Sequence, residues 1–256
     1  MRVGWLVPLL AGCGLWGQEG QQGPKPEWPC VAGRVVDPAY LETSESTGGQ
    51  IFLFQKNEIA QAGPFLTADY THPATVARAV GTLSGAREFE FPVDSTIQSL
   101  LVMVSIQCRA AIGVFRPGGT EMTAANSTQS VDLKAGRAVR IDNPEPGKWK
   151  LRLEGSGLFV AAVRAQSPVR LASVELTAGD ATIHVAGELA NPEFQLVDAA
   201  GDLAPGAEAA EDAGSEHRIS VKPSVERFRV RMTGTDASGW PVERVYPVLF
   251  RAKSSR

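Results

Sequence analysis

The 256-residue sequence contains few of the residues from which metal and catalytic sites are commonly built: three cysteines and three histidines. His72, His184 and His217 have no histidine or cysteine at the short spacing of a zinc site, so a metal site would have to assemble from distant strands. Lys and Arg form no run with interleaved aromatic residues, which argues against nucleic acid as a partner. The sequence predicts no catalytic, cofactor-binding or metal-ligating residues, and we expect a protein that is not an enzyme.

Two short motifs come near catalytic signatures without matching them. Gly155-Ser156-Gly157, which we expect to form a turn between two strands, lacks the Gly-x-Ser-x-Gly spacing of a nucleophile elbow. Gly147-Lys148 lacks the upstream glycine of a phosphate-binding loop. The carboxylates of a glycosidase meet only in the folded protein. An extracellular or periplasmic hydrolase with a site assembled from separated strands therefore stays open as an alternative, as does a structural spacer.

Long apolar runs are also absent, and the longest one near the N-terminus, Val3 to Leu10, is too short to span a bilayer. Its length and the preceding Arg2 are typical of a signal peptide, which we place at residues 1–17. Leu10-Ala11-Gly12-Cys13 resembles the lipobox of bacterial lipoproteins, which makes Cys13 a lipidation candidate and implies a membrane anchor. The alternative is cleavage near Gly17 and free secretion, and both predict an exported protein, extracellular or periplasmic.

If Cys13 is lipidated or removed, Cys30 and Cys108 remain as a pair in an oxidising compartment. A disulfide between them would close a loop of roughly 80 residues and stabilise the fold by about 4 kcal/mol. Two buried thiols are the alternative. Residues 18–36 are rich in Gly, Gln and Pro and predict a flexible tether.

Residues 37–84 show mixed signals that predict a small α/β segment. Asp37-Pro38 is a helix start, and a helix from there ends at Gly48-Gly49. We expect a short strand over residues 50–54, a second helix over residues 56–62 and a helical stretch over residues 73–80.

From Arg87 onward the apolar residues recur with period two, and turn residues separate the runs at intervals typical of a β-sandwich. The runs include residues 100–106, 111–115, 149–153 and 158–165, and Trp149 is expected to fill the core. A second series follows Ser167-Pro168. The fold class predicted is mainly β, with one β-sandwich over residues 85–167 and an Ig-like β-sandwich over residues 168–256.

Several short motifs occur in an order that resembles the hemicentins and the von Willebrand factor A domain-containing protein family. In those proteins the closing elements of an A domain precede a β-sandwich and an Ig-like module. The similar stretches, which span roughly residues 37 to 251, are Ala39-Tyr40-Leu41, Ser46 to Phe52, Phe91 to Thr96, Pro144 to Trp149, Glu154 to Gly157, Phe228-Arg229-Val230, Thr233 to Asp236 and Arg244-Val245-Tyr246.

The resemblance implies that residues 37–84 are a remnant of the end of an A domain. The Asp-x-Ser-x-Ser metal motif of such domains is missing, and the nearest string, Asp94-Ser95-Thr96-Ile97-Gln98, fails at its last position. Metal-dependent adhesion is therefore not implied. The remaining hypothesis is a binding or adhesion protein of the cell surface, with an unknown protein or glycan as its partner.

Overall fold

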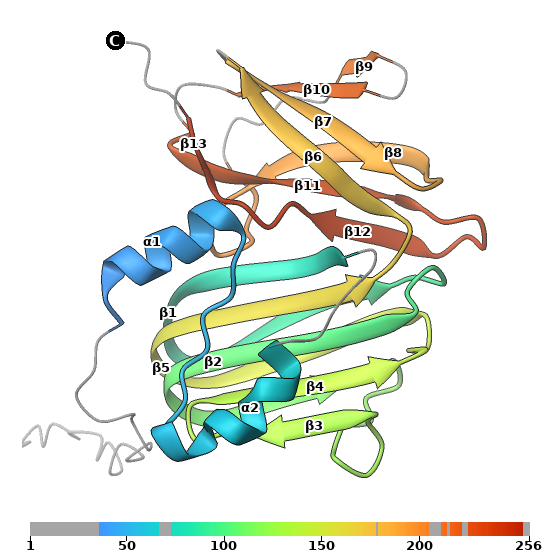
Figure 1. Cartoon of the computed structure of the whole chain (residues 1–256). Coiled ribbons are helices and arrows are strands. Elements are labelled where there is room, and N and C mark those ends of the chain that lie inside the picture. The colour runs from blue at the N-terminus through green and yellow to red at the C-terminus, as the bar shows by residue number, and fades with distance from the viewer. Residues whose placement is uncertain are drawn as a thin grey trace, which may run out of the picture.

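The computed structural model describes residues 36–66, 73–177, 179–204, 211–213, 216–221 and 225–252. These residues form two β-sandwiches stacked on one another, with a helix beside their junction (Figure 1). Every strand pair in the described residues is antiparallel. The predicted mainly β fold class is confirmed.

The first sandwich is built from one sheet of unusually long strands. Its order is β1-β5-β2-β4-β3, so the edges are β1 and the short β3. The strands are β1 (Pro73–Val93), β2 (Ser99–Phe115), β3 (Gln129–Asp132), β4 (Gly136–Asp142) and β5 (Gly147–Gln166).

Strand β5 shows how a single sheet makes both walls of a sandwich. Its alternate residues from Trp149 to Ala165 belong to one core cluster, which requires the strand to curve around that core. The curve lies near Gly155, where an added Cβ would sit 2.4 Å from the Cys108 carbonyl oxygen. The turn expected at residues 155–157 is wrong, because these residues continue the strand and let it pass close to β2.

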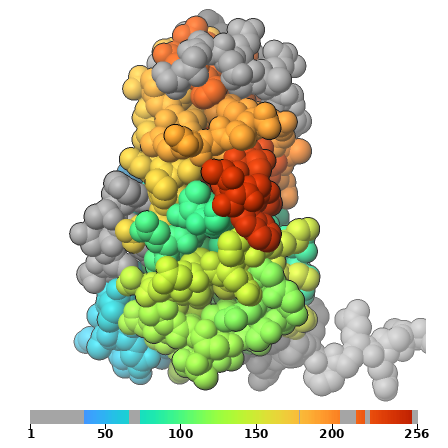
Figure 2. Space-filling model, turned by 90° about the vertical axis from the view of Figure 1, so that its right-hand side faces the viewer, coloured from blue at the N-terminus to red at the C-terminus, as the bar shows by residue number. Residues whose placement is uncertain are grey.

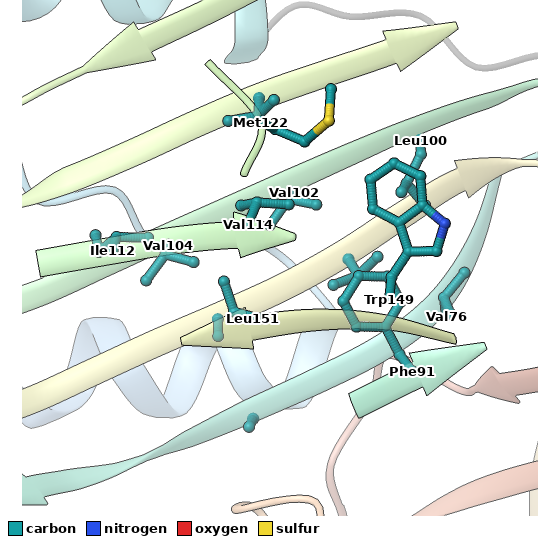
Figure 3. Packing of buried hydrophobic residues seen from close by; sticks show 14 of the residues in the cluster. Val76, Phe91, Leu100, Val102, Val104, Ile112, Val114, Met122, Trp149 and Leu151 are labelled. Carbon is teal, nitrogen blue, oxygen red and sulfur yellow. The ribbon is translucent and has the colours of Figure 1, made fainter. Parts of the chain in front are cut away.

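Trp149 fills the centre of this core, as the sequence predicted. The side chain is 1% exposed and packs among residues of both ends of the long strands, including Val76, Phe91 and Leu100 (Figure 3). Its indole N–H donates a hydrogen bond to the Glu145 carbonyl oxygen at 2.9 Å. The polar edge of the ring is therefore satisfied while its apolar body is buried.

The outer face of β2 and β4 is covered by the segment that precedes β1. Helices η1 (Lys56–Glu58) and α2 (Ile59–Leu66) bring Phe65 against Leu101 and Met103. Burial on both faces explains why residues 100–104 are continuously apolar rather than alternating. The strand expected over residues 50–54 is wrong: this stretch runs as an irregular segment, and the Leu53 amide donates to the Ser105 hydroxyl at 3.0 Å.

The second sandwich uses shorter strands in two sheets. One sheet holds β6 (Arg170–Thr177), β7 (Asp180–Ala186), β10 (Glu216–Ser220) and β9 (Glu211–Ala213). In the other, β11 (Arg227–Thr235) pairs with β8 (Ala190–Val197), β12 (Pro241–Val245) and β13 (Phe250–Arg251). Their facing sides share one apolar core, which includes Ile183, Leu196, Ile219 and Phe228.

Helix α1 (Pro38–Thr47) begins and ends where the sequence predicted. The Asp37 carboxylate accepts a hydrogen bond from the Ala39 amide at 2.9 Å, and Gly48 ends the helix in a left-handed conformation with φ of 70°. An added Cβ at Gly48 would lie 2.9 Å from Pro247, so this turn also fits closely against the second sandwich.

The expected α/β segment of residues 37–84 is not formed as predicted. Residues 73–80 are strand rather than helix, because they open β1 and contribute Val76 and Ala79 to the first core. The first sandwich thus begins at Pro73 instead of residue 85. None of the helices in the described part of the chain has the length and apolar character needed to cross a bilayer.

Candidate functional site

The junction between the sandwiches, here called the seam, is held at one end by a cluster of three buried charges. Glu45 on α1 accepts hydrogen bonds from Arg78 of β1 and from Arg229 of β11. Its distance to the Arg78 Nη2 atom is 2.7 Å, and the three side chains are at most 3% exposed. We call these three residues the clasp, since one carboxylate joins the helix and both sandwiches.

Burial has a measurable effect on the charges of the clasp. Desolvation lowers the pKa of Arg229 to about 10, although the nearby Glu45 carboxylate raises it and Arg78 lowers it further. An unpaired guanidinium would be costly in this position, so Glu45 is required to neutralise it. The clasp is therefore best understood as a structural element that fixes how the sandwiches meet.

The other end of the seam contains a second buried ion pair. Arg244 of β12 lies 2.7 Å from the Asp94 carboxylate, with both side chains at most 1% exposed. Arg244 also donates to the Val169 carbonyl oxygen at 2.9 Å and to the Ser167 hydroxyl at 3.0 Å. These contacts join the β1–β2 connection, the linker between the sandwiches and β12.

Beside this pair, the turn between β11 and β12 lies against the first sandwich, as the red and green atoms of Figure 2 show. The Asp236 carboxylate accepts hydrogen bonds from the Ser95 amide at 2.9 Å and the Ser95 hydroxyl at 2.7 Å. Burial alone would raise the pKa of Asp236, but hydrogen bonds from Ser95, Trp240 and Ser238 hold it below its usual value.

A cavity of about 140 Å³ lies within the seam, between these two sets of contacts. Its first wall is mostly apolar and comes from β1 and β5, including Ala79, Phe89 and Leu151. Its second wall contains Arg231 and Glu243, and the Ala200-Gly201 turn closes one side. Burial raises the pKa of Glu243, partly offset by the Arg231 and Arg244 guanidinium groups.

Two hollows lie at the loop end of the first sandwich, and Arg116 contributes to both. The first, of about 390 Å³, is lined by polar loop residues that include Asn126, Thr128 and Asn143. The second, of about 430 Å³, runs along the outer faces of β1 and β5 and carries Glu88, Glu90, Lys148, Lys150 and Arg152. We call the pair the loop-end surface.

The loops of the loop-end surface are fixed in place by local hydrogen bonds. The Asp142 amide donates to the Thr128 hydroxyl at 2.9 Å, and the Asn143 amide donates to the Gln98 carbonyl oxygen at 2.8 Å. Asn143 adopts a left-handed conformation with φ of 49°, which asparagine tolerates better than most residues. A preformed surface of this kind loses little conformational entropy when it binds a ligand.

Arg116 is the least satisfied polar group of the loop-end surface. Its Nε atom is buried without a hydrogen-bond partner among the described residues, and the nearest carboxylate, that of Glu145, lies 3.9 Å away. In contrast, Lys148 and Lys150 form closer ion pairs with Glu90 at 3.1 Å and Glu88 at 3.2 Å. The buried Nε atom is closed to a ligand, so the capacity left for one lies on the exposed part of the Arg116 guanidinium and on the exposed Asn143 side chain.

The cysteines singled out from the sequence are only partly covered by the structure. Cys13 and Cys30 lie outside the described residues, as do the predicted signal peptide and most of the predicted tether. Cys108 is half-buried on β2 and is not free of partners. Its pairing with Cys30 and the lipidation of Cys13 stay predictions.

Two of the three histidines lie within the described residues, on the paired strands β7 and β10. His217 is buried against the Phe194 ring at 4.5 Å in the second core, and His184 lies on the neighbouring strand β7. His72 falls outside the described residues. Across the described ranges, no group of three or more His, Cys, Asp or Glu side chains could hold a metal ion.

Sequence reasoning missed the buried charges of the seam and the loop-end surface. Glu45 and Arg229 are separated by 184 positions, so no local spacing relates them. The sequence offered one signal: Glu45 and Arg229 are charged residues within stretches whose pattern otherwise predicts a helix and a strand. Such interruptions also occur on solvent-exposed faces, and therefore do not identify a buried pair.

Comparison with known proteins relates the first sandwich to one family. Residues 74–168 match the family model of the hemicentin galactose-binding domain-like domain, and this range coincides with β1 to β5. The hemicentin part of the resemblance is thus supported for the first sandwich. No finding supports the von Willebrand factor A part. No curated protein matches the chain.

Several solved structures are distantly similar. The crystal structure of Bacillus licheniformis lipase BlEst2 in propeptide form aligns with 73% of this chain and 44% of its own length, at 19% identity and a TM-score of 0.40. The β-1,2-glucanase from Parabacteroides distasonis aligns with 72% of this chain and 38% of its own, at 7% identity and a TM-score of 0.24.

The N-terminal Ig1-2 module of the Drosophila receptor protein tyrosine phosphatase DLAR aligns with 71% of this chain and 99% of its own length. Its identity is 9% and its TM-score is 0.23. At these TM-scores the likenesses carry no argument about function.

Proposed function

We propose that this chain is a non-catalytic, exported binding protein whose first sandwich recognises a glycan through the loop-end surface. The observation that carries the proposal is the position of Arg116 and Asn143, which line a preformed hollow with side chains that are open to solvent. The match of residues 74–168 to a galactose-binding domain-like family model supports the same assignment.

The chemistry of the hollow suits the hydroxyl groups of a sugar. Amide and hydroxyl groups can donate to and accept from sugar hydroxyls, and a guanidinium can donate to them; these groups are arranged on three separate loops. Trp149 lies below them but is buried, so the proposed recognition depends on hydrogen bonds and not on stacking against this ring.

Export and anchoring through Cys13 form the second part of the proposal. The apolar run of residues 3–10 and the lipobox-like string support it. Expression with radiolabelled palmitate tests it, comparing the wild type with Cys13→Ala. Labelling of the wild type alone supports a lipid anchor, and equal labelling of both contradicts it.

Glycan binding is tested with the full-length protein on a glycan array, followed by titration of the best ligand. We expect Arg116→Gln and Asn143→Asp each to weaken binding by about tenfold, since each removes hydrogen-bond donors from the hollow. Asparagine and aspartate both tolerate a left-handed backbone, so the second change preserves the turn.

Arg218→Gln is the matched control, because Arg218 is an exposed residue of the second sandwich whose ion pair is with Glu216. It should leave binding unchanged. Absence of any bound glycan, or equal binding by the two loop-end variants and the wild type, contradicts the proposal.

A further inference from the structure

We infer that the cavity in the seam is a second binding site, separate from the loop-end surface, and that its ligand is a free neutral monosaccharide or polyol. The inference does not depend on the proposed glycan recognition. It rests on the composition of the cavity, on an unpaired carboxylate in its wall and on the contacts that hold it open.

The cavity brings together residues that are far apart in the sequence. The first sandwich contributes a wall of small and aromatic side chains, among them Ala77, Ala79 and Phe89. The second contributes Arg231, Glu243 and Val245, from adjacent strands β11 and β12. An apolar wall facing a few polar groups is the usual composition of a small-molecule pocket, and such pockets commonly lie between modules.

Glu243 is the polar group that most needs a ligand. Its side chain is half-buried, and it forms no hydrogen bond or ion pair within the described residues. A carboxylate accepts up to about four hydrogen bonds and donates none when ionised. The ligand must therefore offer hydrogen-bond donors at this point of the wall.

The surrounding charges favour hydroxyl donors over a cation. Two guanidiniums act on the Glu243 carboxylate: that of Arg231 on β11 and that of Arg244, the next residue of β12 itself. The cavity lining also contains Arg78 and Glu90. Arg244 is already paired with Asp94, whereas the Arg231 Nη2 group is bonded to the neutral Gln195 side chain at 2.5 Å. The lining thus contains two guanidiniums, of Arg78 and Arg231, and two carboxylates, of Glu90 and Glu243. These formal charges cancel, which favours a neutral hydroxyl over an ammonium ion.

The volume sets the size of the ligand. A site of about 140 Å³ holds on the order of ten water-sized groups, at roughly 10–15 Å³ for each. A monosaccharide or a cyclic polyol has a comparable number of non-hydrogen atoms. Its hydroxyls would meet Glu243, and its C–H face would contact the alanine and phenylalanine side chains of β1.

Contacts around the cavity keep its walls at a fixed separation. The Arg78–Glu45–Arg229 clasp lies at one end of the seam, and the Asp94–Arg244 pair lies at the other. Between them, the Val80 amide donates to the Ala199 carbonyl oxygen at 2.7 Å. A ligand would therefore enter a preformed site that joins both sandwiches.

The experiment titrates the full-length protein with galactose, glucose, mannose and myo-inositol, by saturation-transfer NMR and by isothermal titration calorimetry. We expect saturable binding of at least one of them, with a Kd in the millimolar range or tighter. Glu243→Gln, which keeps the side-chain volume, should weaken that binding by about tenfold.

Ala200→Leu provides an independent test, because it adds volume at the cavity wall without removing a polar group. It should weaken binding by about tenfold as well, and thermal unfolding of each variant checks that the fold is kept. Glu193→Gln is the matched control, since Glu193 is exposed on the neighbouring strand β8 and should leave binding unchanged.

Two results would overturn the inference: no saturable binding of any of the four compounds, or binding that both cavity variants leave unchanged. Failure here is distinguishable from failure of the loop-end proposal. Arg116→Gln and Asn143→Asp should leave binding of the small ligand intact, just as Glu243→Gln and Ala200→Leu should leave glycan binding at the loops intact.

Discussion

The two sandwiches bury their apolar cores by different means, and the core of the first is the larger. In the first, strands of up to 21 residues curve so that the same strands form both walls. In the second, strands of nine residues or fewer are divided between two separate sheets. The first core is thus enclosed by continuous strands of one sheet. The second sandwich depends more on its contacts with α1 and with the first sandwich.

The buried charges show where these contacts lie. Arg229 and Arg244 belong to the second sandwich and are at most 1% exposed, yet the carboxylates that neutralise them lie on α1 and on the β1–β2 connection. If the second sandwich were detached, both guanidinium groups would lose these partners. The stability of the second sandwich therefore depends more on contacts across the seam than that of the first does.

The largest expected effect is on the first core. Trp149→Ala should lower the free energy of unfolding by about 3–5 kcal/mol, since it empties the centre of the curved sheet. Urea denaturation followed by circular dichroism measures it. Trp240→Ala is the matched control: that ring is 40% exposed and should change the stability by less than about 0.5 kcal/mol. Similar losses for both variants would contradict the description of the core.

Removing the carboxylate of the clasp tests the dependence of the second sandwich on the seam. Glu45→Ala leaves Arg78 and Arg229 buried without their counter-charge, and should cost about 3 kcal/mol. We expect denaturation to separate into two transitions, with the second sandwich unfolding first. Glu42→Ala removes an exposed ion pair with Arg251 and should cost less than about 1 kcal/mol. A single transition with an equally small loss for Glu45→Ala would refute the comparison.

The curvature of the first sandwich is tested at its closest backbone approach. Gly155→Ala places a Cβ 2.4 Å from the Cys108 carbonyl oxygen, and we expect it to lower the free energy of unfolding by about 2 kcal/mol. Gly63→Ala in α2 is the control, because no atom lies within 4 Å of its added Cβ. That change should stabilise the protein by up to about 1 kcal/mol in a urea titration. If neither change lowered the free energy of unfolding, the close approach of β5 to β2 would not require glycine at position 155.

The smallest expected effect is a pH dependence at the seam. Burial raises the pKa of Glu243 in the folded protein, so the folded state holds its proton at pH values where the unfolded state has lost it. The stability of the wild type should therefore fall, relative to Glu243→Gln, as the pH rises from about 4 through the raised pKa. Thermal unfolding of both proteins between pH 3.5 and pH 7 measures this change. A stability difference between them that stays constant over this range would contradict the prediction.

The elements that could be predicted from the sequence are those determined by neighbouring residues. Asp37-Pro38 and Gly48 fix both ends of α1 through a cap, a constrained φ and a left-handed turn. The period-two pattern after Arg87 identifies strands, and Trp149 is placed in the core by its size and position. Each of these signals acts over a few residues, and each is confirmed.

The errors arise where distant contacts decide the conformation. Residues 73–80 were expected to be helical, but they pair with β5 across 80 positions or more. Gly155 and Gly157 were expected to form a turn, because nothing local shows that the chain continues past them beside β2. The charges of the seam and the polar groups around Arg116 belong to the same class, since only the fold brings them together.

The position of α1 has a mechanical consequence. A force that pulls on residue 36 while the sandwiches are held by a bound partner is transmitted first to the helix, and from there through Glu45 to both sandwiches in parallel. The Leu249 amide donates a hydrogen bond to the Glu45 carbonyl oxygen at 2.8 Å, and this bond would bear part of the same force. The contacts of Glu45 are therefore the first that such a force would load.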